Sequence, residues 1–181
     1  MSGEATGLET WGNFYLVTSA AAAALVGLLF VVLTLAADRL AASESKRIRT
    51  YLTPSVFQLS FVLLFAALLT FPAHSRLSIT ISCGTMGALG LGYAVSVLLG
   101  GVRGHSFRDP RDILQYSVLP AIAYATLIAG GALVSTSDTP RPGFTCVASG
   151  VLALIALAIR NSWSVAVSVV SMRGRDDGPD R

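Results

Sequence analysis

Five long segments with almost no charged residues restrict what this sequence can fold into. Four of them contain no Asp, Glu, Lys or Arg over 25 or 26 consecutive residues, and the fifth is interrupted only by Arg160. A transmembrane helix needs about 20 predominantly apolar residues, so each segment is long enough to cross a bilayer. The segments are 12–37, 50–75, 77–102, 113–137 and 142–172.

These segments leave too little sequence for a separate soluble core. Only 13% of the residues are charged, whereas an average soluble domain has about a quarter. We therefore predict one all-α transmembrane domain over residues 1–181, and we exclude a cytosolic enzyme, a secreted domain and a nucleic-acid-binding protein. The predicted helices are 12–37, 53–71, 77–102, 113–135 and 144–171, followed by a flexible cytoplasmic tail at 173–181.

The basic residues predict how the chain is oriented. From the N-terminus to the tail, the segments outside the predicted helices contain 0, 4, 1, 3, 1 and 3 Lys or Arg residues. Cytoplasmic loops are enriched in these residues, so the N-terminus is expected outside and the C-terminus inside. Arg outnumbers Lys 12 to 1, a usage typical of GC-rich bacterial genes. We expect a multi-pass protein of the bacterial inner membrane.

The first cytoplasmic loop, 38–52, allows two interpretations. It mixes apolar with charged residues, so it forms either a short helix on the anionic inner leaflet or a plain connector.

Few side chains within the predicted helices can carry chemistry. Lys46, His74 and His105 lie in loops, and the predicted helices contain no Asp or Glu. Intramembrane enzymes, pumps and haem proteins depend on such groups. We therefore predict no catalytic residue, no cofactor and no metal site. Cys83 and Cys146 are expected to be buried thiols rather than a disulfide.

Small residues recur every four positions in the third predicted helix. This spacing lets two helix backbones approach closely, within the bundle or between subunits. The predicted helix-packing residues are Gly84, Ala88, Gly92, Ser96 and Gly100.

The fifth predicted helix carries a stripe of small and hydroxyl residues around Arg160. Successive steps of three or four residues keep these positions on one helical face, and Asn161 flanks it. In a helix from 144 to 171, about 42 Å long, Arg160 lies just cytoplasmic of the middle. The stripe comprises Thr145, Ser149, Ala153, Ala156, Arg160, Ser164, Ser168 and Ser171.

Two interpretations of this stripe are open. It lines a water-filled path in which Arg160 attracts anions, with Thr145, Ser149, Asn161, Ser164 and Ser168 as further lining residues. Alternatively, the small residues pack against the third helix and Arg160 extends to the inner headgroups.

In either case the guanidinium requires partners. The candidates are acceptors such as Gln58, Asn161, Tyr124 and the hydroxyl stripe, or water in a pore, or an anion. Trp163, three residues after Arg160, either stacks on the guanidinium or packs elsewhere.

Both ends of the sequence carry aromatic motifs. Trp11 and Tyr15 lie one helical turn apart and are predicted to anchor the first helix at the outer interface. The start Trp11-Gly12-Asn13-Phe14-Tyr15 with its Ala-rich continuation over 21–31, and the later Ile159-Arg160-Asn161-Ser162-Trp163, resemble a group of small multi-span bacterial membrane proteins of unknown function. This resemblance implies no activity, cofactor or catalytic residue.

From these features we expect a homo-oligomeric channel or small-solute pore, lined by the fifth helix and with weak anion preference. The alternative is a non-catalytic membrane module that binds or regulates a larger membrane protein. The expected partners are the lipid bilayer and further copies of the chain, with no nucleic acid.

Overall fold

The computed structural model describes residues 5–37, 42–71, 75–103 and 113–176, with side chains described over 11–34, 53–71, 75–100 and 113–164. Every regular element in these ranges is a helix, which confirms the predicted all-α bundle. The elements are α1 (Ala5–Ala37), α2 (Ala42–Leu69), α3 (Arg76–Arg103), the π-helical segment η1 (Leu114–Val118), α5 (Leu119–Thr136) and α6 (Arg141–Asp176).

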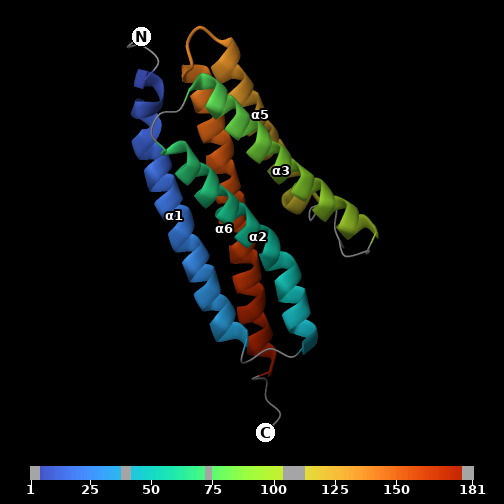
Figure 1. Ribbon diagram of the computed structural model, residues 1–181. Helices are drawn as coiled ribbons and strands as arrows, with labels where there is room; N and C mark the ends of the chain where they lie inside the picture. Colours follow the sequence, from blue (N-terminus) through green and yellow to red (C-terminus); the bar gives the residue numbers. More distant parts are fainter. Residues whose placement is uncertain (1–4, 38–41, 72–74, 104–112, 177–181) are drawn as a thin grey trace.

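The helices pack in a row rather than in the order of the chain. α5 lies between α3 and α6, and α6 in turn packs against α2, whose other neighbour is α1. Figure 1 shows successive helices running in opposite directions, with the α3–α5 pair leaning away from the other helices toward the end where α3 finishes. The last helix therefore occupies the centre of the row.

Four helical stretches among the described residues are long and apolar enough to cross a membrane. They are Trp11–Thr34, Arg76–Gly100, Leu114–Thr136 and Arg141–Ser164. The apolar part of α2, Thr53–Leu69, is shorter. Large apolar side chains such as Leu16, Phe30 and Leu89 are more than half exposed, as a surface in contact with lipid tails requires.

Three helices extend beyond their predicted ends. α1 begins at Ala5, ahead of the predicted start at residue 12. α2 begins at Ala42, so most of the 38–52 loop continues the second helix instead of forming a separate element. α6 continues to Asp176 and includes the start of the segment predicted as a flexible tail. Residues 177–181 lie outside the described part of the chain.

The π-helical turn of η1 precedes Pro120 and has a direct cause. A proline has no backbone N–H, and its ring clashes with the carbonyl four residues earlier. Here the Leu119 backbone N–H bonds to Leu114 O, five residues back, and Pro120 occupies the first turn of α5. The wider turn thus accommodates the proline within a continuous helix.

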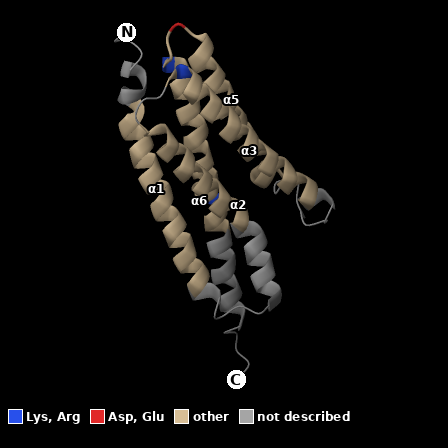
Figure 2. Cartoon of the chain, viewed as in Figure 1, with Lys and Arg blue, Asp and Glu red and all other residues tan. Residues whose placement is uncertain are grey.

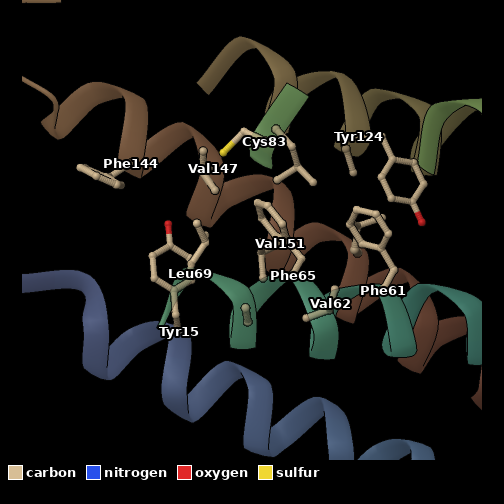
Figure 3. Packing of buried hydrophobic residues seen from close by; sticks show 14 of the residues in the cluster. Tyr15, Phe61, Val62, Phe65, Leu69, Cys83, Tyr124, Phe144, Val147 and Val151 are labelled. Atoms are coloured by element: carbon tan, nitrogen blue, oxygen red, sulfur yellow. The ribbon is translucent and has the colours of Figure 1, made fainter. Parts of the chain in front are cut away.

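The main core lies where α2, α5 and α6 meet, with contributions from α1 and α3. Figure 3 shows Tyr15, Phe65, Leu69, Cys83 and Val151 converging there, and all five side chains are fully buried. A second, smaller cluster of Leu29, Leu59 and Ala158 joins α1, α2 and α6 further along the bundle.

Candidate functional site

The polar stripe of α6 lies on the outside of the protomer. All six stripe residues with described side chains are exposed, and they are Thr145, Ser149, Ala153, Ala156, Arg160 and Ser164. Ser168 and Ser171 belong to α6, but their side chains lie outside the described residues. α6 packs against α5 and α2, and α3 is not among its main neighbours. The interpretation that the stripe packs against the third helix is therefore wrong for a single chain.

The hydroxyl groups of this face donate to the backbone of their own helix. Thr145 bonds to Arg141 O at 3.0 Å, Ser149 to Thr145 O at 2.8 Å and Ser164 to Arg160 O at 3.2 Å. With their protons used in this way, these hydroxyls present oxygen lone pairs outward. On this face, the N–H donors of the described side chains therefore belong to the Arg160 guanidinium.

An aromatic contact between α1 and α6 relates the position of Arg160 to the length of α1. The Trp11 and Phe144 rings stack with centroids 6.4 Å apart, so these residues lie at the same level. At 1.5 Å per residue, Arg160 is roughly 24 Å further along α6, while the uncharged part of α1 continues roughly 39 Å to Ala37. Measured against this uncharged length of α1, Arg160 lies somewhat beyond the midpoint, toward the end at which α1 finishes.

Arg160 is isolated from other charged groups in the described part of the chain. Figure 2 shows the basic and acidic residues at the end where α3 and α6 begin, apart from one basic position further along α6. The Arg160 guanidinium forms no hydrogen bond or ion pair with a described residue, so Gln58, Asn161 and Tyr124 do not serve as its acceptors. The Trp163 side chain is not packed inside the protomer, because it is 72% exposed. Arg160 thus stands on the surface without a partner among the described side chains.

Asn161 faces the interior of the protomer, whereas Arg160 faces outward. It is fully buried, and Gln115 Nε2 of η1 donates a 2.6 Å hydrogen bond to its Oδ1 atom. The expectation that Asn161 is a further lining residue of the exposed stripe is therefore wrong for a single chain. The contribution of Gln115 was missed, although Gln58 and Gln115 are the chain's only glutamines and both lie in uncharged segments. A side-chain amide within a membrane helix needs a hydrogen-bond partner, so the presence of Gln115 in an uncharged segment indicates a polar contact inside the bundle.

The small-residue ladder of α3 also faces outward. Ala88, Gly92, Ser96 and Gly100 are exposed, and a Cβ atom built on Gly92 meets nothing within 4 Å. The prediction that this ladder packs the bundle is wrong within one chain. α3 approaches α5 through other glycines, Gly87 against Ile128 and Gly90 against Tyr124.

The two predicted interface anchors behave differently. Trp11 is partly buried and stacks on Phe144. Tyr15 is fully buried in the main core, and its hydroxyl has no hydrogen-bond partner among the described residues. Tyr15 is therefore a core residue, because its position on α1 faces α2 and α6 and not the headgroups.

The cysteines are free thiols, with Cys83 buried and Cys146 partly buried. Among the described residues, no group of three or more His, Cys, Asp or Glu side chains is placed to hold a metal ion.

The all-helical fold, the four long apolar helices and the exposed apolar surface define a multi-pass α-helical membrane protein. Comparison of the chain with family models, curated proteins and solved structures gives no match in any of the three. Its function is therefore argued from its own residues.

Proposed function

We propose that the chain forms a homo-oligomer in the bacterial inner membrane, in which the outer faces of α6 from neighbouring copies line a path for small solutes. In this proposal five helices cross the membrane, with the N-terminus outside and the C-terminus in the cytoplasm. The polar stripe then faces an aqueous path instead of lipid tails.

The observation that carries the proposal is the exposed polar face around Arg160. An arginine at the centre of a membrane helix costs about 2.5–3.5 kcal/mol on insertion scales, and the cost falls toward the interface. Arg160 has no partner among the described residues of its own chain. A second copy and the water between copies would supply the missing solvation.

The position of Arg160 favours a weak preference for anions. Charged side chains arranged in a ring select ions of opposite sign at a pore constriction or mouth. In an oligomer, Arg160 would repeat around the axis on the cytoplasmic side of the middle of the path. Because the stripe hydroxyls present acceptors, selectivity would depend on this one residue.

Ion flux into liposomes, together with the mass of the protein in detergent, tests this proposal. The unaltered protein should be larger than one chain and conduct anions. Arg160→Gln should reduce anion flux without unfolding the protein, and Arg160→Glu should shift selectivity toward cations. Leu28→Gln places the same amide on the exposed face of α1 and should leave flux unchanged.

A single-chain mass for the unaltered protein would rule out the oligomeric path. So would the absence of flux in all variants combined with tolerance of Arg160→Leu. Either result would favour the alternative of a module that binds or regulates a larger membrane protein.

A further inference from the structure

A second group of polar residues, contributed by α6 and α2, is enclosed within the protomer. Asn161 of α6 and Ser55 of α2 are fully buried, and Gln58 of α2 is 1% exposed. None of the three is charged.

These three residues lie at one level of the bundle. Leu59 of α2 and Ala158 of α6 belong to the same buried cluster, and the two antiparallel helices pack against each other. Asn161 follows Ala158 by one helical turn, while Gln58 and Ser55 precede Leu59 by one and four residues. Because the helices run in opposite directions, these steps lead toward the same end of the bundle.

Each of the three side chains has a polar atom that no described residue satisfies. The atoms are Asn161 Nδ2, Gln58 Oε1 and Ser55 Oγ. Gln115 uses the other side of Asn161, its Oδ1 atom. A buried polar group without a hydrogen bond costs about 1–3 kcal/mol, so each of these groups calls for a partner other than a described side chain, and their shared level allows one partner to serve all three.

The chemistry of these atoms restricts what that partner can be. Asn161 Nδ2 is a donor, Gln58 Oε1 is an acceptor and the Ser55 hydroxyl is both. An anion would be repelled by Gln58 Oε1, and a cation by the Asn161 amide protons. A neutral molecule that both donates and accepts, as water does, satisfies all three.

We propose that Ser55, Gln58 and Asn161 form an internal hydrated site in each protomer, which takes a neutral hydrogen-bonding molecule of the size of water. Gln115 positions the Asn161 amide toward this site by holding its oxygen. The site lies inside one chain, so it does not depend on the oligomeric path proposed above.

Cysteine labelling in liposomes tests the site. In a background with Cys83 and Cys146 replaced by alanine, single cysteines would replace Gln58 or Asn161. Leu29→Cys serves as the buried apolar control at the same level on α1, and Val62→Cys as the control one turn further along α2. Because D2O has the size of the proposed occupant, the S–H groups at positions 58 and 161 should be labelled with deuterium several-fold faster than those at positions 29 and 62, as followed by the S–H infrared band.

Hydrogen–deuterium exchange of the unaltered protein gives a second measurement that requires no substitution. Backbone amides at 55–59 and 158–162 should exchange faster than those at 25–29, which lie at the same level on α1. Equal labelling of all four cysteines, or equal exchange in these three segments, would overturn the proposal.

Discussion

Gly90 of α3 lies directly against the ring of Tyr124 on α5. A Cβ atom at Gly90 would overlap Cδ1, Cε1 and Cγ of that ring. The ring cannot move aside easily, because Tyr124 is fully buried and meets Phe61 edge to face at 4.9 Å. The missing side chain of Gly90 is thus what allows α3 and α5 to approach at this level.

This contact predicts that Gly90→Ala destabilises the fold. Overpacking of a filled core typically costs about 1–3 kcal/mol, so the thermal midpoint in detergent should fall measurably. Gly92→Ala is the matched control, since the space around Gly92 is open and the change also raises helix propensity. Equal midpoints for the two variants would contradict the packing described for α3.

The Gln115–Asn161 hydrogen bond should appear as an energetic coupling between η1 and α6. A double-mutant cycle of Gln115→Leu and Asn161→Leu, measured by unfolding in detergent, should give about 0.6 kcal/mol, and up to about 1.7 kcal/mol for a strong bond in a membrane protein. Pairing Asn161→Leu with Thr85→Ala, on the exposed face of α3, should be additive.

The open face of α3 gives a prediction about self-association. Leucine at position 92 fits within the protomer, because nothing lies within 4 Å of a Cβ there. If the ladder makes contacts between copies, Gly92→Leu should shift the detergent-solubilised protein toward monomer and leave its unfolding midpoint unchanged. Ala20→Leu, on the exposed face of α1, should not change the mass. Unchanged mass for Gly92→Leu would remove the ladder from the interface.

Orientation in the membrane is testable with single cysteines in the same cysteine-free background. A cysteine at Asp138, between α5 and α6, should react in intact cells with a thiol reagent that does not cross the membrane. One at His105 should react only after the cells are opened, because three basic residues place its loop in the cytoplasm. The reverse pattern would invert the proposed topology.

The sequence predicts where helices form better than it predicts which way they face. Charges mark the ends of the apolar segments, and α1 ends at Ala37 as expected, but α1, α2 and α6 continue through charged residues at their other ends. The inward faces are harder because lipid is as apolar as the protein core, so hydrophobicity does not separate them. In α3 the ladder of Gly84 and Gly92 and the pair Gly87 and Gly90 look alike in sequence, yet it is Gly87 and Gly90 that meet α5.

For the polar residues of the candidate site, too, the sequence does not predict which way each side chain faces. Arg160 and Asn161 are adjacent, and the helical turn of about 100° between them separates an exposed side chain from a buried one. The sequence identifies both as unusual in a membrane helix. Only the arrangement of α2 and η1 around α6 determines that Asn161 is the enclosed one.

The π-helical turn before Pro120 affects how this helix can tolerate insertions and deletions. A turn closed over five residues holds one residue more than an α-helical closure, so it acts as a one-residue insertion in an otherwise regular helix. Deleting one residue from 114–118 would turn the π-helical turn into a regular α-helical one. The residues that precede the deletion would then be rotated about the helix axis by about 100° relative to α5. Gln115 would then leave the α6 side, so the length of this turn, as much as the identity of its residues, determines whether Asn161 keeps its donor.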